Sequence, residues 1–187
     1  MKKLNLGCGL DYKKGFINVD WCIGDNFKFD IKHNLENLPY PFKDSEFDYI
    51  LMDNVLEHLE DKIKIIEELH RISKPNAVIE IYVPHCSSYM AFGNPTHKSF
   101  FSVGSLGNFE PKCWEKYSKK EFHVKSELIW LDSRDWVLIK PLKRLMNWLI
   151  NKNHFITERF FANLIGIDHI KFTLRTIKFA NSGDGEQ

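Results

Sequence analysis

The first half of the chain alternates short apolar runs with polar stretches. The runs KLNLGC, FINVD, FDYILMD and AVIEIYVP are bounded by turn residues and predict strands over residues 3–8, 16–20, 47–53 and 77–84. Between the last two, apolar residues recur at steps of three and four, which predicts one helix from residue 54 that ends at Pro75. Strands joined by a crossover helix predict an α/β fold, with a mostly parallel sheet that carries helices on both faces.

The second half has a weaker pattern. Residues 85–120 are aromatic, punctuated by glycine and without a period, so they predict a long loop or lid. Strands are expected at 121–131 and, as a C-terminal antiparallel element, at 169–179; helices are expected at 136–153, broken or started near Pro141, and at 158–166. The polar tail 180–187 should be frayed. With no repeat and no linker, we expect one domain, 1–187, with a cofactor-binding half (1–85) and an acceptor half (86–187).

The composition of the chain limits the kinds of partner that it is expected to bind. The 187 residues are 43% hydrophobic and 27% charged with a net charge of +1, which is typical of a soluble globular protein and argues against a nucleic-acid partner. No secretory signal is visible and no apolar run approaches the ~18 residues of a membrane helix, so a cytoplasmic location is expected. The four cysteines form no CxxC pair, and the sequence therefore indicates neither a metal site nor a disulfide framework: Cys8, Cys22, Cys86 and Cys113.

The stretch LNLGCG places two glycines directly after the first strand. Glycine has no Cβ and tolerates positive φ, so Gly7 and Gly9 allow the backbone to approach a ligand closely. A dinucleotide site needs a third glycine and an acid about 20 residues further on. Here Tyr12 occupies the third position and Asp20 follows Gly9 by only eleven residues, so the pattern does not fit a pyrophosphate ligand.

Asp20 ends the second predicted strand. A carboxylate at such a point can accept hydrogen bonds from both hydroxyls of a ribose. A glycine turn with this acid and without a phosphate cradle predicts a nucleoside that carries no pyrophosphate, and S-adenosylmethionine fits that description. The plainer interpretations are that the glycines serve only the turn and that Asp20 caps a helix.

The order and spacing of these segments resemble the class I S-adenosylmethionine-dependent methyltransferases, whose fold is Rossmann-like. The resemblance covers LNLGCG, FINVD, NLENLPYPFKDSEFDYILMDNVLEHLED and LHRISKPNAVIEIYVP, about residues 3–85. It is greatest to the compact, methyltransferase type 11-like branch, in which the glycine motif is followed almost at once by the second strand. FDYILMDNVLEHL with HRISKPNAVIEIYVP is its most specific part.

The resemblance implies a set of cofactor-binding residues. Gly7, Cys8 and Gly9, preceded by Asn5, would line the methionine moiety of S-adenosylmethionine. Asp20 would bind the ribose, so its replacement by alanine should weaken cofactor binding and leave the fold intact. Cys8 is expected to be a small spacer, since no motif pairs it with a base.

The same resemblance places further residues on the other side of the cofactor. Trp21 would lie beside the adenine, and Asn34 stands where many relatives have an acid near the adenine amino group. The remaining expected contacts, beside the sulfonium, are Asp53, Asn54, Val55 and His58. Asp53 and Asn54 would also serve as helix caps, and Glu57 and His58 as polar helix surface.

The acceptor chemistry is expected in the segment that follows the fourth strand. Relatives carry a similar segment with histidine and aromatic residues over the active site, so His85 and His97 are the candidate general bases. The methyl donor is already activated, and the protein has only to align the reactants and remove a proton from a hydroxyl. Neutral histidine suits that step, although a loop histidine also serves as a structural hydrogen-bond donor.

The predicted helix at 136–153 and the segment after it combine aromatic and basic residues. A peripheral membrane contact, a lipid-linked substrate and stacked bases are the functional alternatives. The structural interpretation, which we favour, is that the apolar face of this helix packs on the sheet and its charged side chains are solvated. The residues concerned are Trp136, Lys140, Lys143, Arg144, Trp148, Lys152, Phe155, Phe160 and Phe161.

These expectations converge on an enzyme that transfers the methyl of S-adenosylmethionine to a small-molecule or sugar acceptor, by O- or N-methylation. The near-neutral charge favours this acceptor class. A catalytically inactive subunit that binds the cofactor and an RNA methyltransferase are the alternatives, although Asp53 is followed by NVL rather than by the PP(Y/F) of a (D/N)PP(Y/F) motif.

Overall fold

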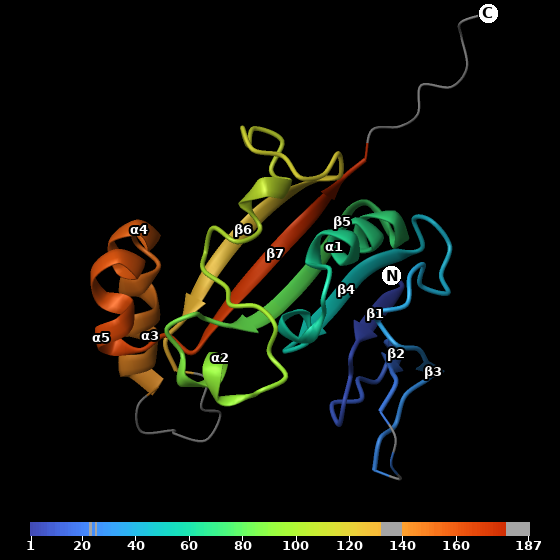
Figure 1. Cartoon of the computed structure of the whole chain (residues 1–187), viewed down its shortest axis with the longest axis horizontal. Coiled ribbons are helices and arrows are strands. Elements are labelled where there is room, and N and C mark those ends of the chain that lie inside the picture. The colour runs from blue at the N-terminus through green and yellow to red at the C-terminus, as the bar shows by residue number, and fades with distance from the viewer. Residues whose placement is uncertain (23, 25, 132–139, 179–187) are drawn as a thin grey trace, which may run out of the picture.

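Seven strands form one sheet that runs through the whole molecule (Figure 1). The computed structural model describes residues 1–22, 24, 26–131 and 140–178. The strands are β1 (Lys3–Leu6), β2 (Ile17–Asp20), β3 (Ile31–Lys32), β4 (Phe47–Asp53), β5 (Ser73–Pro84), β6 (Glu121–Ile129) and β7 (His169–Ile177). The helices are α1 (Lys62–Ile72), α2 (Tyr89–Gly93), α3 (Lys140–Ile150), α4 (His154–Ile156) and α5 (Ala162–Ile165), with 3₁₀ turns η1 (Leu56–His58) and η2 (Gly107–Phe109) and a π-helical turn η4 (Thr157–Phe161).

The sheet order is β3-β2-β1-β4-β5-β7-β6. The first five strands pair in parallel, whereas β7 is antiparallel to both β5 and β6. The expected Rossmann-like α/β fold, with a mostly parallel sheet flanked by helices and a C-terminal antiparallel strand, is therefore confirmed. Strands from both halves of the sequence belong to the same sheet.

The helix predicted from residue 54 to Pro75 is wrong in its boundaries. The chain forms η1, then breaks, and α1 begins only where the Asp61 side chain accepts the N–H of Lys64 at 3.0 Å. It ends at Ile72, and Pro75 already lies in β5. Proline disfavours helical backbone in the residue before it, so the strand starts earlier than periodicity alone suggests. The two-residue strand β3 was not predicted, because it is too short to show alternation.

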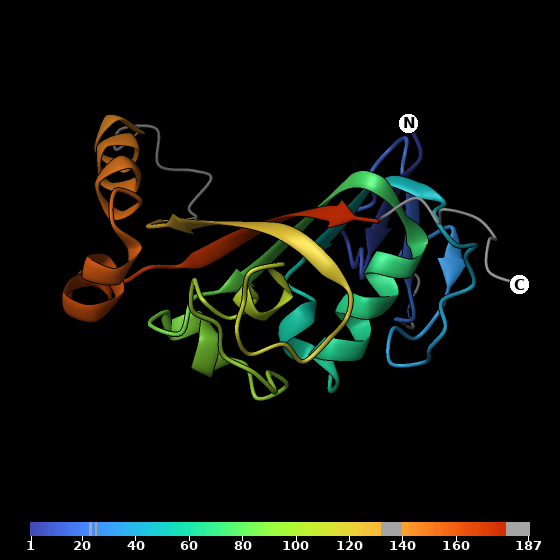
Figure 2. The same cartoon turned by 90° about the horizontal axis from the view of Figure 1, so that it is seen from above.

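The core lies on one face of the sheet. Ile65, Ile66 and Leu69 of α1 are buried in the same cluster as the inward side chains of β4 and β5. Figure 2 shows α1 and the segment that follows β5 on the same side of the sheet. On the other face Tyr49 and Glu80 are only half-buried, and the Tyr49 hydroxyl donates to Glu80 Oε2 at 2.7 Å. This part of the second face is thus covered less completely than the first.

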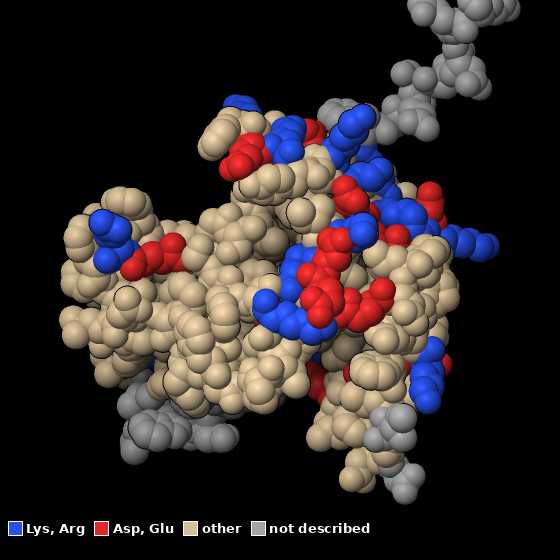
Figure 3. Space-filling model, viewed as in Figure 1, with Lys and Arg blue, Asp and Glu red and all other residues tan. Residues whose placement is uncertain are grey.

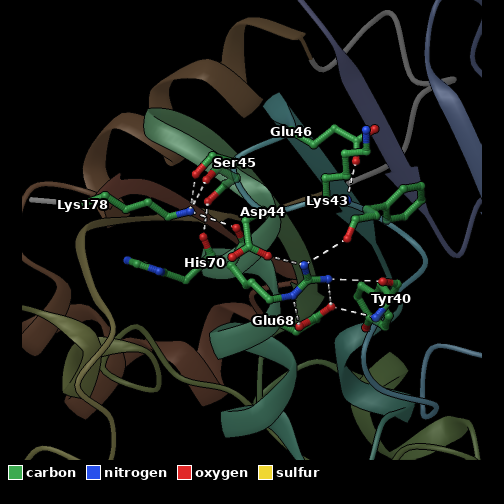
Figure 4. Close-up of polar contacts among 11 residues, drawn as sticks. Tyr40, Lys43, Asp44, Ser45, Glu46, Glu68, His70 and Lys178 are labelled. Atoms are coloured by element: carbon green, nitrogen blue, oxygen red, sulfur yellow. Dashed lines mark hydrogen bonds and ion pairs between the residues drawn. The ribbon is translucent and has the colours of Figure 1, made fainter. Parts of the chain in front are cut away.

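A polar clamp joins the last strand to the first half of the chain (Figure 4). Just after β7, the Lys178 amine donates to Ser45 Oγ at 2.9 Å and to the carbonyl of Ser73 at 2.6 Å. Next to it, Glu68 of α1 accepts the Tyr40 N–H at 2.7 Å. The clamp holds the start of β4 and β5 against the end of β7.

The helices after β6 pack differently from what the sequence predicted. In α3 only Ile150 is buried, whereas Leu145 and Trp148 are 51% and 57% exposed. The expectation that its apolar face packs on the sheet is therefore wrong. On the face drawn in Figure 3, charged side chains gather around α1 and the N-terminal strands and are few over α3, α4 and α5. Trp136 and the tail 180–187 fall outside the described residues.

Candidate functional site

The candidate cofactor site lies at the carboxyl ends of β1, β2 and β4. Directly after β1, Gly7 and Gly9 have φ values of +67° and +50°, which L side chains rarely adopt. A Cβ on Gly7 would lie 2.5 Å from Cγ2 of Val55, whereas a Cβ on Gly9 would meet no atom within 4 Å. Gly7 is therefore required by close packing as well as by its backbone conformation, and Gly9 only by conformation.

Asp20 closes the turn at the end of β2. Its carboxylate accepts the N–H groups of Gly9 (2.7 Å), Trp21 (2.7 Å) and Cys22 (2.9 Å), and the residue is only 5% exposed. Burial opposes ionisation, but these N–H groups, with that of Cys22 contributing most, lower the pKa of Asp20. Asp20 thus shapes the glycine turn itself, and the expectation that its removal leaves the fold intact no longer holds.

Asn5 and Cys8 support the same turn from inside. The buried Asn5 amide donates to the Asp11 carbonyl at 3.1 Å and to Asn18 Oδ1 at 3.0 Å, which fixes the loop that follows Gly9. Burial, aided by the charge of Asp20, raises the pKa of Cys8 to about 11. The thiol is therefore protonated at neutral pH and acts as a small buried group.

A pocket of about 440 Å³ opens beside the turn. It is lined by Asn5, Gly7, Cys8, Leu10, Asp11, Asp53 and Asn54. Asn54 has φ +53°, and its amide donates to Asp53 Oδ1 at 2.9 Å. Its carbonyl oxygen lies 3.1 Å from Nε2 of His169, the first residue of β7. The last strand therefore helps to orient the end of β4.

Six of the eleven predicted cofactor residues lie outside this pocket lining: Gly9, Asp20, Trp21, Asn34, Val55 and His58. The Trp21 side chain is 57% exposed on the rim beyond Asp20. Asn34 uses its carbonyl oxygen to accept the N–H of Glu36 at 3.0 Å and so stabilises a turn. Neither arrangement excludes contact with a ligand, and their adenine roles stay predictions.

A second pocket, of about 500 Å³, lies on the other side of Asn54, which lines both. Its walls include Pro84, Tyr89 and Met90 together with Glu57, His58 and His97. The Lys98 N–H donates to the Glu57 carbonyl at 2.8 Å, which attaches the loop after α2 to η1. This contact brings His97 beside His58, with ring centroids 4.7 Å apart.

Glu57 was assigned to helix surface, and the structure places it in the interior. The residue is 1% exposed, and among the described residues neither carboxylate oxygen has a hydrogen-bond partner. Burial, together with the nearby charge of Asp53, raises the pKa of Glu57 to about 7. Helical periodicity could not reveal this, because the helix is broken at this point.

The two candidate bases have different surroundings. His97 lines the second pocket, but His85 is 1% exposed and lines neither pocket of this site. The Ser87 N–H donates to His85 Nδ1 at 3.0 Å, which leaves the ring proton on Nε2, 3.1 Å from Glu158 Oε1. Burial lowers the pKa of His85, and the Glu158 contact offsets part of this effect. His85 therefore ties the end of β5 to η4.

Sequence reasoning missed several site residues. Leu10 and Asp11 line the first pocket, His169 contacts Asn54, and Glu57 faces the second pocket. Leu10 and Asp11 directly follow the glycine turn and could have been included on that ground. The place of His169 depends on the pairing of β5 with β7, which no local pattern reveals.

The pocket beside the turn fits S-adenosylmethionine. Its volume lies in the range of small-molecule sites, and the glycine turn leaves a cradle that a Cβ would disturb. The Asp20 carboxylate accepts three N–H groups and also contacts the Cys22 thiol, so its ribose role stays a prediction.

Comparison with known proteins gives one family match and a shared fold. Residues 4–81 match the family model of the methyltransferase domain. No curated protein sequence matches the chain. The family match spans the two glycines, Asp20 and the end of β4.

Solved structures share the fold at low sequence identity. An S-adenosylmethionine-dependent methyltransferase from Archaeoglobus fulgidus has a TM-score of 0.59 at 19% identity, over 94% of this chain and 86% of that one. Another from Mesorhizobium loti has a TM-score of 0.55 at 14% identity, over 93% and 90%. Phosphoethanolamine N-methyltransferase 2 from Haemonchus contortus, in complex with phosphomonomethylethanolamine and S-adenosylhomocysteine, has a TM-score of 0.54 at 14% identity, over 96% and 50%.

Proposed function

We propose that this chain, a class I S-adenosylmethionine-dependent methyltransferase, methylates an oxygen or nitrogen of a small molecule or sugar. S-adenosylmethionine is its cofactor and supplies an activated methyl group on a sulfonium. The observation that supports the acceptor class is the second pocket, of about 500 Å³, which adjoins the cofactor pocket at Asn54. Its size suits a small molecule or a single sugar unit rather than a folded partner.

The cofactor-binding roles are assigned as the family resemblance implies, and the first pocket supports them for Asn5, Gly7, Cys8, Asp53 and Asn54, which line it. We assign the methionine moiety to the turn Gly7–Cys8–Gly9 with Asn5 behind it, and the ribose to Asp20. Asp53, Asn54 and Val55 would face the sulfonium from the end of β4, with His58 beyond them. Trp21 and Asn34 would bound the adenine. The half formed by residues 1–85 would thus hold the cofactor, and residues 86–187 would complete the acceptor side.

The acceptor side requires alignment and removal of one proton when the acceptor is a hydroxyl. Of the two candidate bases, His97 is the better supported, because it lines the second pocket. His85 is better supported as a positioning residue, because both of its ring nitrogens form hydrogen bonds within the protein. Loss of His97 should lower turnover by about 10²- to 10⁴-fold with nearly unchanged cofactor affinity, the range for a general base.

The decisive experiment is a methylation assay on cell extract. Purified protein and S-adenosylmethionine with a labelled methyl group are added to extract, which is then separated into small-molecule, glycan, lipid, protein and RNA fractions. Label in the small-molecule or glycan fraction is expected. Label confined to protein or RNA would overturn the proposed acceptor class, and Gly7→Ala protein serves as the background control.

Calorimetry tests the cofactor assignment separately. We expect S-adenosylmethionine and S-adenosylhomocysteine to bind and NAD not to bind, because the glycine turn lacks the third glycine and the distant acid of a dinucleotide site. Binding of NAD without binding of S-adenosylmethionine would contradict the assignment.

The exposed side chains of α3 to α5 support a peripheral contact with an anionic membrane surface. Trp148, Phe155 and Phe160 are 57%, 74% and 66% exposed. Basic residues flank them, Lys140, Lys143 and Arg144 on α3 among them, and α3 carries no acidic residue. Aromatic and basic side chains together bind the headgroup region of anionic bilayers. Among the described residues, no helix is long and apolar enough to cross a membrane.

The two alternative functions predict different results in the extract assay. A catalytically inactive subunit would bind S-adenosylmethionine and label no fraction of the extract. An RNA methyltransferase would label the RNA fraction, a result that ribonuclease treatment would remove.

A further inference from the structure

The side chains of Glu57, His58 and His97 converge beside the second pocket. One ligand atom from each lies within 4.8 Å of the other two, and Nε2 of His97 is 3.9 Å from Glu57 Oε1. They come from η1 and from the loop after α2, which the main-chain hydrogen bond from Lys98 to Glu57 holds together. We propose that these three residues bind one divalent transition-metal ion, of the zinc class.

The tautomer of each histidine is determined by its neighbours. His97 Nδ1 lies 2.8 Å from the carbonyl oxygen of Ala91, which accepts only, so the ring proton is on Nδ1. His58 Nδ1 lies 2.8 Å from Thr96 Oγ1, whose own proton is donated to Asn94 Oδ1 at 2.8 Å. The proton of His58 is therefore on Nδ1 as well. Both Nε2 atoms are left with a lone pair, as a metal ligand requires.

These outer hydrogen bonds are those typical of metal-binding histidines. Such residues usually donate the other ring N–H to a carbonyl or hydroxyl oxygen, which sets the ring orientation and raises the basicity of the ligating nitrogen. Here the Ala91 carbonyl serves His97 and Thr96 serves His58. Both rings are thus held by contacts outside the triad.

Glu57 provides the second, independent observation. Its carboxylate is 99% removed from solvent and, among the described residues, neither oxygen has a hydrogen-bond partner. An unpaired buried carboxylate costs several kcal/mol, so such groups are normally paired or bound to a cation. At 3.9 Å the His97 nitrogen does not form a hydrogen bond with it. Two imidazole lone pairs and a carboxylate that face one another suit a cation between them.

The donor set identifies the class of cation. Two imidazole nitrogens and one carboxylate oxygen suit zinc and its first-row neighbours, whereas magnesium and calcium prefer oxygen ligands throughout. Ligands of a tetrahedral zinc ion lie about 3.3 Å apart, as follows from bonds of about 2.0 Å. The side chains have therefore to close in by about 1 Å from the separations in this structure.

Three protein ligands would leave one coordination position open, and Pro84, Tyr89 and Met90 line the same pocket. This part of the inference rests on the proposed function: the open position would take an acceptor oxygen. A hydroxyl bound to the metal has a lowered pKa and releases its proton to water. Its lone pair then forms the O–C bond as the C–S bond breaks, with that electron pair returning to sulfur. His97 would act through the metal rather than as a free base.

Metal binding is tested without any acceptor. Protein stripped with a chelator is titrated with Zn²⁺ by calorimetry. We expect one ion per chain for wild type and an affinity at least ~100-fold lower for Glu57→Gln and for His97→Gln, because loss of an outer-shell partner alone costs 10- to 100-fold. His123→Gln is the control, since His123 is exposed and far from the triad in sequence.

Two further measurements keep the result interpretable. Zn²⁺ should raise the melting temperature of wild type and leave that of Glu57→Gln unchanged, while the metal-free variant melts no lower than metal-free wild type, since it lacks the unpaired carboxylate. The Co²⁺ complex should show no thiolate charge-transfer band, which excludes adventitious binding by the four free cysteines.

Absence of stoichiometric binding, or equal affinity in wild type, Glu57→Gln and His97→Gln, would overturn the metal site. S-adenosylmethionine calorimetry on the metal-free protein separates this failure from a failure of the proposed function. If the cofactor binds and His97→Gln loses turnover with no metal bound, the imidazole is itself the base and the metal site is rejected.

Discussion

The glycine turn and the helices α3 to α5 lie toward opposite edges of one sheet, and they use their side chains in opposite ways. At the turn, polar groups are buried and engaged: Asn5 is 2% exposed and Asp20 5%, and both hold backbone groups of the loop. In α3 to α5, large apolar groups are exposed, with Leu164 at 80%. The first region resists change because its contacts depend on one another. The second is free to meet a surface outside the chain.

Gly7→Ala should have the largest effect. The new Cβ would lie 2.5 Å from Val55, at a φ of +67°. Left-handed strain costs about 1–2 kcal/mol and overpacking about 1–3 kcal/mol, so the free energy of unfolding should fall by about 2–5 kcal/mol and cofactor binding should be lost. Urea unfolding and calorimetry with S-adenosylmethionine measure both.

Gly9→Ala is the matched control for Gly7. The new Cβ would stand at a positive φ but in open space. The free energy of unfolding should therefore fall only by the cost of the strained backbone, about 1–2 kcal/mol. Adding Val55→Ala to Gly7→Ala should restore part of the stability. Equal effects of the two glycine variants would show that packing against Val55 does not matter.

Asp20→Asn tests the polar side of the same region. The amide group must turn a donor toward one of the three N–H groups that the carboxylate accepts, so we expect a loss of about 1.5–3 kcal/mol in the free energy of unfolding and weaker cofactor binding. Urea unfolding and cofactor calorimetry report the two effects. A variant with unchanged stability and weakened binding would restore the simpler view that Asp20 serves the ribose alone.

His85→Gln tests the junction between the two regions through pH. Burial lowers the pKa of His85 in the folded state, partly offset by Glu158, so the folded protein keeps it neutral. As pH falls below about 6.5, the unfolded chain takes up a proton that the folded chain does not, and the free energy of unfolding decreases by up to about 1.4 kcal/mol per pH unit until the folded pKa is reached. His85→Gln should reduce this slope.

Urea unfolding at pH 5.5, 6.5 and 7.5 measures the effect. His123→Gln is the control, because His123 has a 70% exposed side chain and its removal should leave the slope unchanged. The buried His70, whose pKa is also lowered by burial, keeps a residual slope in both variants. A slope in His85→Gln equal to that of wild type would contradict the assignment.

Phe160→Ala should have the smallest effect on the fold. The side chain is 66% exposed, so stability should change by no more than ~0.5 kcal/mol, while sedimentation with vesicles of anionic lipid should decrease. Ile150→Ala, at a position 4% exposed in the same group of helices, should instead cost about 2–5 kcal/mol. Unchanged vesicle sedimentation in Phe160→Ala would remove the support for a membrane contact.

The sequence predicted the glycine turn better than the helices α3 to α5, because the contacts of the turn lie within one short segment of the chain. Gly7, Gly9 and Asp20 lie within one strand–turn–strand unit, and their spacing alone indicated a nucleoside site. The contacts of α3 were predicted wrongly, because an amphipathic pattern shows that a helix has an apolar face and not what covers it. Glu57 was misplaced because the break between η1 and α1 changes which face each residue occupies.

The sequence by itself determined the α/β class, the glycine turn, the acid at the end of β2 and the loop that carries His97, since these follow from local backbone chemistry and from periodicity within single elements. Tertiary structure alone decided that β7 lies between β5 and β6, which brings His169 to Asn54. It also decided that Glu57, His58 and His97 meet, across a gap of about forty residues in the chain. Contacts between distant segments depend on how the whole sheet pairs and packs, and no single segment carries that information.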